Sequence, residues 1–413
     1  MARRIRESSL ILPAGLAVAL LASVFAQAAA QDNSTDAGHY LVAAGNCISC
    51  HTAKNGQPFA GGLAITTPLG TIYSTNITPD TETGIGRWSL SDFTHALREG
   101  IAADGHRLFP AFPYTSFTKV NDQDAAAMFA YLRTLSPVRS APPANDIVLR
   151  QRWGVALWNA TYFEPGRYVP DRAHSAEWNR GAYLTLGLGH CGACHTPRNL
   201  LLAEIPSEAF AGGDLQVSRG DERPLHWSAV NLTPSSTGLG GWSVDDIVKY
   251  LSVGFTQRGG AFGPMNEVIL NSTRHLSPDD LHAIAVYLKA LPAREPNVDP
   301  TPSSEQTKAG AIVYADRCET CHLASGRGGI LKAPRLAGSA VVQAENPASL
   351  INIILLGADA PTDALGAFAG WETMKPYKDV LSDEETAAVA NFVRNSWGNK
   401  ARAVTPREVA RQR

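Results

Sequence analysis

Cysteine is scarce in this sequence and is confined to three places. The 413 residues contain six cysteines, and all six lie in the pentapeptides Cys47–His51, Cys191–His195 and Cys318–His322, each of the form Cys-x-x-Cys-His. No cysteine is left over for a structural disulfide or for completing a four-ligand zinc site. Any role of the cysteine thiols is therefore part of the role of these three motifs.

A surplus of basic residues and long apolar stretches are also lacking. Lys and Arg number 36 against 38 Asp and Glu, which gives a formal charge of −2. This balance provides no argument for a nucleic-acid partner, and we expect none. Beyond residue 30, no uninterrupted apolar run reaches the ~20 residues that a membrane-spanning helix needs.

The motif Cys-x-x-Cys-His is typical of covalent haem c attachment. Within one helical turn, two cysteines three apart share a face, so both thiols can add to the vinyl groups of one porphyrin. The histidine that follows can then bind the iron. A single Cys-x-x-Cys could equally be a redox dithiol or half a zinc site, and both alternatives are kept. Three copies predict three covalently bound haem c groups. The predicted thioether residues are Cys47, Cys50, Cys191, Cys194, Cys318 and Cys321, and the predicted proximal ligands are His51, His195 and His322.

Residues 1–30 have the pattern of a secretory signal peptide. Arginines at the start precede the apolar run Leu10–Phe25, and a small-residue zone at Ala26–Ala30 follows. The alternative is an uncleaved membrane anchor, for which the run is short. We expect cleavage, export to the periplasm, and a peripheral position on the outer face of the inner membrane. Export agrees with haem c chemistry, because haem is attached to such proteins outside the cytoplasm.

An internal repeat organises the rest of the chain. The segment Gly38–Leu41, the first motif, Phe59–Gly62 and Asn76–Pro79 recur in the same order around the second motif. The third motif lies in a more distant copy. Each copy is expected to open and close with a helix and to enclose a haem within loops rich in Gly, Pro, Thr and Asn. We predict a mainly α fold with three tandem domains. The predicted boundaries are 1–30 for the signal peptide, 31–136 for domain 1, 137–178 for an aromatic-rich connector, 179–292 for domain 2, 293–308 for a linker, 309–399 for domain 3 and 400–413 for a C-terminal tail.

The closing helices have start signals in the sequence. They are predicted near 122–135, 277–291 and 382–397, and Ser277 and Ser382 stand as N-caps before acidic residues. Aromatic residues near these helices, among them Tyr131, Tyr287 and Phe392, are interpreted as helix-to-helix contacts.

Methionine is the usual sixth ligand of an electron-transferring haem c. Met1 leaves with the signal peptide, which leaves three methionines. Met128 lies within a helical pattern and is interpreted as core. Met265, in Gly263-Pro264-Met265, and Met374, just before the last closing helix, lie in loops and are predicted distal ligands. The alternative for both is core packing.

The first motif has no such methionine. Aligning the repeats places Phe112 where Met265 stands, and phenylalanine cannot bind iron. The first haem therefore takes another ligand or is five-coordinate. His106 is the best substitute in the same loop, and the alternative is a surface histidine beside Asp104.

The chain resembles the tri-haem cytochrome c subunits of membrane-bound bacterial dehydrogenases for alcohols, gluconate and fructose, and of related molybdenum hydroxylases. The resemblance runs from Gly38 to Arg413 and rests on the three motifs, on Ala111–Tyr114, where many relatives have Met for Phe, on Gly263-Pro264-Met265, and on Asn395–Asn399. It implies class I cytochrome c-like domains wrapped around covalent haems. It also implies a large catalytic partner subunit with flavin, a quinone cofactor or molybdenum, and electron delivery to quinone or another acceptor of the terminal oxidase chain.

Three functions remain open from the sequence. The first is an electron-transfer subunit whose protein tunes each haem through its axial ligand and burial. The second is a peroxidase-like enzyme with an open first haem, although no cluster of acid, base and arginine is evident for it. The third is a free periplasmic electron shuttle.

Overall fold

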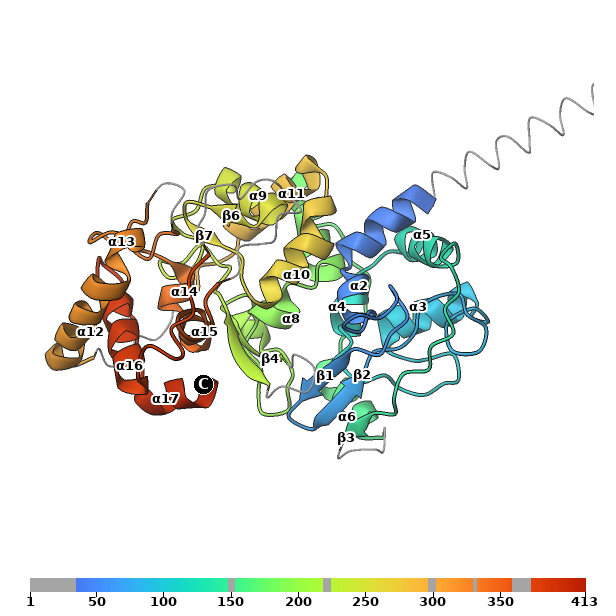
Figure 1. Cartoon of the computed structure of the whole chain (residues 1–413). Helices are drawn as coiled ribbons and strands as arrows, with labels where there is room; N and C mark the ends of the chain where they lie inside the picture. The colour runs from blue at the N-terminus through green and yellow to red at the C-terminus, as the bar shows by residue number, and fades with distance from the viewer. Residues whose placement is uncertain (1–34, 148–152, 218–223, 296–301, 330–332, 359–372) are drawn as a thin grey trace, which may run out of the picture.

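A computed structural model describes residues 35–147, 153–217, 224–295, 302–329, 333–358 and 373–413. The predicted signal peptide lies outside these ranges. The three motif-bearing units follow one another along an elongated molecule, from the first repeat through the second to the third unit (Figure 1). No helix within the described ranges has both the length and the apolar character to cross a bilayer.

The first repeat begins with a helix over residues 35–44 and is mainly helical, as predicted. Its further elements and those of the connector are α2 (Cys47–Cys50), β1 (Ala64–Thr67), β2 (Gly70–Tyr73), α3 (Leu90–Glu99), α4 (Tyr114–Phe117), α5 (Asp122–Leu132), β3 (Asp146–Ile147) and α6 (Trp153–Tyr162). The strands form one antiparallel sheet in the order β1-β2-β3.

The second repeat has the main elements of the first in the same order, with additional short elements between them. Its elements are α7 (Ala176–Tyr183), η1 (Leu184–Leu188), α8 (Gly192–His195), η2 (Pro206–Glu208), β4 (Gly213–Val217), β5 (Leu225–Ala229), α9 (Val244–Val253), β6 (Phe255–Thr256), β7 (Gly259–Gly260), α10 (Pro264–Asn271), η3 (Thr273–His275) and α11 (Pro278–Lys289). β4 pairs antiparallel with β5, and β6 with β7.

The named elements in the described part of the third unit are all helices, joined by loops. Its elements are α12 (Ser304–Arg317), α13 (Glu319–His322), α14 (Ala340–Gln343), α15 (Ala348–Leu356), α16 (Asp383–Arg394) and α17 (Pro406–Gln412).

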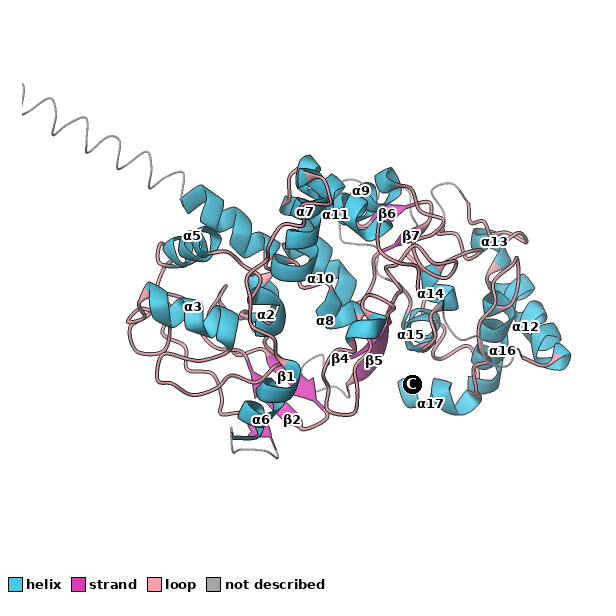
Figure 2. Ribbon diagram, turned by 180° about the vertical axis from the view of Figure 1, so that it is seen from behind, coloured by secondary structure: helices cyan, strands magenta, loops and turns pink. Residues whose placement is uncertain are grey.

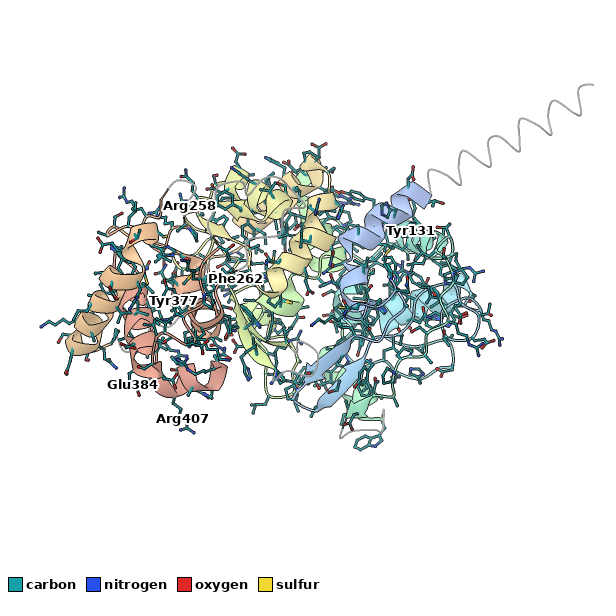
Figure 3. The ribbon with its side chains drawn as sticks, viewed as in Figure 1. Tyr131, Arg258, Phe262, Tyr377, Glu384 and Arg407 are labelled. Atoms are coloured by element: carbon teal, nitrogen blue, oxygen red, sulfur yellow. The ribbon has the colours of Figure 1, made fainter. Side chains whose placement is uncertain are left out.

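In each unit the opening helix crosses the closing helix at a glycine. A Cβ on Gly38 would lie 2.1 Å from the Ala127 carbonyl oxygen, and a Cβ on Gly310 would lie 2.0 Å from that of Ala388. A Cβ on Gly181 would lie 1.9 Å from the carbonyl oxygen of Ala283. The aromatic residues predicted at these contacts are confirmed there: the Cβ atoms of Tyr131, Tyr287 and Phe392 border the three glycines, and Tyr131 is labelled in Figure 3.

A Gly310→Ala variant is expected to lower the free energy of unfolding by about 1–3 kcal/mol, because the added methyl forces α12 and α16 apart. Denaturant unfolding measures this. Gly154→Ala is the matched control: Gly154 lies in α6, and no atom lies within 4 Å of its added Cβ. The control is expected to keep its stability or gain up to roughly 1 kcal/mol. An equal loss of unfolding free energy in Gly310→Ala and Gly154→Ala would contradict a close crossing of α12 and α16 at Gly310.

Two hydrophobic cores hold the molecule together. One contains Leu41 and Phe117 of the first repeat together with Leu184 and Ile284 of the second. The other belongs to the third unit and includes Ile351. The first two repeats therefore share a core, and the division into three domains stays a prediction.

The closing helices begin where their caps predicted. Ser277 and Ser382 accept from the backbone N–H of Asp280 and Glu385, and α5 begins at Asp122. Other parts differ from the expectation. Short hairpins lie in stretches expected to be loop, and α12 starts at Ser304, within the predicted linker, because Ser303 forms a capping box there.

The predicted C-terminal tail is part of the fold, which corrects the sequence interpretation. Thr405 and Glu408 form a capping box for α17, and Val404 and Val409 are buried in the core of the third unit. The Gln412 side chain donates to the carbonyl of His226 at 2.7 Å, so α17 also joins the third unit to the second repeat. Figure 2 shows β5 beside α15 and α17.

Candidate functional site

The three Cys-x-x-Cys-His motifs fold into the same turn. In each, the histidine backbone N–H donates to the carbonyl of the first cysteine, at 2.9 Å for His51, 3.0 Å for His195 and 2.9 Å for His322. α2, α8 and α13 form these turns, so each pair of cysteines lies within one helical turn. The structure thus brings the predicted residues of each motif together three times.

The three histidines share one orientation. Nδ1 of His51 lies 2.6 Å from the Thr75 carbonyl oxygen, Nδ1 of His195 lies 2.7 Å from that of Val230, and Nδ1 of His322 lies 3.0 Å from that of Pro334. A carbonyl can only accept, so Nδ1 carries the proton and Nε2 is left as the ligand atom.

Burial lowers the pKa of each of these histidines, and the hydrogen bond to the carbonyl opposes this only in part. The rings are therefore neutral at neutral pH, which is the form that binds iron.

The sequence analysis did not predict these carbonyl acceptors, although a repeated sequence pattern marks two of them. Thr75 and Val230 stand directly before the repeated segments Asn76–Pro79 and Asn231–Pro234. In both segments the asparagine side chain accepts from the backbone N–H of the threonine two residues on, at 2.9 and 2.8 Å. These turns aim the preceding carbonyl at the histidine.

The cysteines have the properties of thioether precursors. All six are free of disulfides. Burial raises the pKa of Cys47 and of Cys191 to about 12, and the neighbouring cysteine of each motif adds to the shift. A redox dithiol needs a lowered pKa. Over the described part of the chain, no three His, Cys, Asp or Glu side chains are grouped to hold a metal ion. Cys47 and Cys191 therefore lack the lowered pKa of a redox dithiol.

A cavity of about 1530 Å³ adjoins the first motif. Cys47, Cys50 and His51 line it together with apolar side chains, among them Ile65 and Phe112, and it continues past Cys194 toward the third unit. Both cysteines and the histidine of the first motif thus line one cavity. These residues fit a covalently held haem.

Phe112 lies just before the N-cap of α4, whereas Met265 is the second residue of α10. α4 follows α3 as α10 follows α9 in the second repeat. The equivalence of Phe112 and Met265 stays a prediction. The Phe112 ring packs on Phe117 with centroids 5.5 Å apart, so the wall of the first cavity is apolar at this position.

His106 lies outside the lining of that cavity. Its Nδ1 is 2.5 Å from Oδ1 of Asp104, and its side chain is 38% exposed. The pKa of Asp104 is lowered chiefly by its hydrogen bonds to His106. This is the geometry of a surface ion pair, and ligation by His106 stays a prediction.

Met265 is the second residue of α10, and Gly263 sets up the start of that helix. Gly263 has φ 54°, and a Cβ there would lie 2.7 Å from the Trp227 ring. Phe262, labelled in Figure 3, packs on the same ring with centroids 6.0 Å apart. A glycine is therefore required for the start of α10 to lie this close to Trp227 of β5.

Met374 borders the core of the third unit together with Cys318 and Tyr377. Its carbonyl accepts from the N–H of Ala358 at 3.2 Å, which fixes the segment that carries it. Both methionines thus stand at ordered positions outside the closing helices, and their roles as distal ligands remain predictions.

Glu204 places a titratable carboxyl beside the second motif. A Cβ on Gly192 would lie 3.2 Å from Oε2 of Glu204, and Arg198 is 3.6 Å from Oε1. Burial raises the pKa of Glu204, and Arg198 opposes the rise. Ionisation of this carboxyl adds a negative charge, which favours ferric iron. The midpoint potential of the second haem is therefore expected to fall as pH rises through the raised pKa.

Redox titrations at several pH values check this expectation. Glu204→Gln cannot ionise, so it is expected to flatten the dependence. The same slope in the variant and the wild type would contradict the assignment to Glu204.

Comparison with known proteins agrees with this geometry. A family model described as cytochrome c matches residues 35–136 and 307–397. The cytochrome c subunit of alcohol dehydrogenase (quinone) from Gluconobacter oxydans (strain 621H) is 42% identical over 408 residues, which cover 93% of this chain and 84% of that protein.

Two further relatives carry similar names. The gluconate 2-dehydrogenase cytochrome c subunit of Pantoea cypripedii is 40% identical, over 93% of this chain and 91% of that protein. The fructose dehydrogenase cytochrome subunit of Gluconobacter japonicus is 36% identical, over 92% of this chain and 82% of that protein. The chain therefore belongs to the cytochrome c family and, within it, to the group that includes the cytochrome c subunits of alcohol, gluconate and fructose dehydrogenases.

Proposed function

We propose that this protein is a three-haem electron-transfer subunit of a dehydrogenase complex in the periplasm. One observation carries the proposal: the same attachment turn occurs three times, each with a histidine whose Nδ1 is held by a backbone carbonyl. Bound haem supplies one-electron redox chemistry. The chain's own residues hold the porphyrin through two cysteines, fix the tautomer of the ligand and exclude water by burial.

The partner and the acceptor follow from the relatives. Because those proteins are named as subunits of dehydrogenases, the electron donor is proposed to be a catalytic dehydrogenase subunit with flavin, a quinone cofactor or molybdenum. The proposed acceptor is quinone or another component of the oxidase chain, reached by a protein that sits peripherally on the membrane. Met265 and Met374 are proposed as the distal ligands of the second and third haems.

The experiment that tests this function counts haems and identifies partners. Intact mass after denaturation is expected to show three covalently held haems on each chain that has lost its signal peptide. Purification from the native membrane under mild detergent is expected to bring down a large catalytic subunit. Fewer than three haems, or zinc in their place, would overturn the cofactor assignment, and three haems without any partner would favour a free shuttle.

Phe112 favours a second candidate function. Because it lines the first cavity with an apolar ring, the first haem has an open position for a small neutral ligand if nothing else binds it. Turnover of peroxide by the reduced protein, at a rate that depends on the first motif, would support this haem-enzyme alternative.

A further inference from the structure

In the first two repeats, a buried asparagine stands directly after the residue whose carbonyl holds the proximal histidine. These asparagines are Asn76 and Asn231, which are 3% and 8% exposed. Each side-chain oxygen accepts from the backbone N–H and from the hydroxyl of the threonine two residues on, Thr78 or Thr233, at 2.7–2.9 Å. Both acceptor positions of the oxygen are thus used within the turn, and the amide N–H groups are left for another segment.

In the first repeat, that other segment is the chain that leaves the closing helix α5, called here the exit segment. Nδ2 of Asn76 donates to the carbonyl of Val138 at 2.7 Å. The backbone N–H of Val138 donates in return to the Thr78 hydroxyl at 3.1 Å. Val138 is therefore held through both its N–H and its carbonyl, and the exit segment is clamped to the turn that follows Thr75.

The second repeat contains the same clamp at equivalent positions. Nδ2 of Asn231 donates to the Arg294 carbonyl at 2.7 Å, and the Arg294 N–H donates to the Thr233 hydroxyl at 3.0 Å. Arg294 follows α11 as Val138 follows α5. Because the same donors and acceptors recur, the clamp is a feature of the repeat and not of one loop.

The third unit forms a comparable clamp with the roles exchanged. Here the asparagine, Asn399, lies on the exit segment after α16 and is 3% exposed. Its Nδ2 donates to the carbonyl of Leu336 at 3.1 Å, and its Oδ1 accepts from the N–H of Gly338 at 2.7 Å. Leu336 lies two residues after Pro334, whose carbonyl lies against Nδ1 of His322. In each of the three units, one buried asparagine thus ties the exit segment to the chain beside the acceptor of the histidine.

The clamps act on the direction of that acceptor. The carbonyl of Thr75 and the N–H of Asn76 belong to one planar peptide group, so a clamp that holds Asn76 also orients the carbonyl. A bond from Nδ1–H to a carbonyl makes the imidazole a more basic ligand, which favours ferric iron. Release of the clamp lets the carbonyl turn away from Nδ1, so the ligand becomes less basic and ferrous iron is favoured.

We propose that Asn76, Asn231 and Asn399 are positioning residues, each of which sets the hydrogen bond on the proximal histidine of its own unit and thereby the potential of the haem held there. None of the three asparagines needs to touch the haem for this role. The inference rests on the proposed three-haem function.

Redox titration of the protein with its three haems tests the proposal on Asn76→Ala, Asn231→Ala and Asn399→Ala. Each variant is expected to raise one of the three midpoint potentials and to leave the other two unchanged, and a different potential is expected to move in each. At a fixed applied potential, the ferrous-to-ferric ratio of the affected haem is expected to rise about tenfold. A general loss of stability would not move one potential selectively.

Asn391→Ala is the matched control in the third unit. Asn391 is 1% exposed, its Nδ2 donates to the Val404 carbonyl at 2.9 Å, and its Oδ1 accepts from the Val404 N–H at 2.6 Å. It ties the exit segment to α16 instead of to the segment that carries Pro334. Denaturant unfolding is expected to show similar losses of stability in Asn391→Ala and Asn399→Ala, whereas only Asn399→Ala is expected to move a potential.

Three unchanged potentials in all the clamp variants, or an equal shift in Asn391→Ala and Asn399→Ala, would overturn the proposal. If a clamp variant loses a haem, Thr78→Val and Thr233→Val decide instead, because valine has the shape of threonine and lacks only the hydroxyl. One raised potential in each supports the clamps, and unchanged potentials refute them. A wild type with fewer than three haems would refute the three-haem function, and the same titration would still test the clamps of the haems that remain.

Discussion

A Phe112→Met variant is expected to raise the midpoint potential of the first haem by on the order of 0.1 V, within the roughly 0.8 V that axial ligands span. Phe112 lines the same cavity as Cys47 and His51, so a thioether at this position would be available as a ligand to a haem held by these residues. Such a ligand favours ferrous iron. It also fills the position that carbon monoxide needs, so binding of carbon monoxide by one reduced haem is expected to disappear.

Redox titration and carbon monoxide difference spectra measure the two effects, and Phe112→Leu is the control that stays apolar and provides no ligand. In the leucine variant, the first haem is expected to keep its wild-type midpoint potential and to bind carbon monoxide.

A His106→Ala variant tests whether His106 binds the iron of the first haem. If His106 bound the iron, its loss would change the spectrum of the first haem, whereas the pairing of His106 with Asp104 predicts no change. A wild type that binds no carbon monoxide would contradict an open first haem.

Met265→Ala is expected to have the opposite effect on the second haem. Loss of the thioether should remove the sulfur-to-iron band at the red end of the spectrum from one haem, and lower that haem's potential by on the order of 0.1 V. It should also create a site that binds carbon monoxide. The other two haems are expected to keep their potentials, because the hydrogen bond that joins α10 to the first motif comes from Asn271, which the variant retains.

Met128→Ala is the matched control for this prediction. Met128 is fully buried in α5 and belongs to the shared core. Its truncation is expected to cost about 2–5 kcal/mol of stability and to leave the sulfur-to-iron band intact. A band that survives in Met265→Ala, or that vanishes in Met128→Ala, would contradict the ligand assignment.

Local patterns in the sequence predicted the parts of this fold that depend on nearby residues. Ser277 and Ser382 predicted the starts of α11 and α16, because an N-cap bonds to a backbone N–H only three residues away. The Cys-x-x-Cys-His turns were predicted for the same reason. The start of α17 carried an equally local signal, since Thr405, Pro406 and Glu408 form a cap, but the residues were interpreted as a tail.

Contacts between distant segments could not be predicted in this way. Nothing beside His190 in the sequence indicates that its ring meets that of Phe117 in the other repeat. The same holds for the aromatic-rich connector. Its Trp158 donates to the Leu201 carbonyl at 2.9 Å, whereas its Trp153 is 65% exposed. Such outcomes depend on how the repeats pack against each other.

The core shared by the first two repeats has a consequence for biogenesis. Leu41 and Phe117 bury themselves against Leu184 and Ile284, which are made much later during synthesis. While the first repeat is emerging, its partners in the shared core have not yet been made. We therefore expect the first repeat to reach its compact state only together with the second, whereas the third unit has a core of its own.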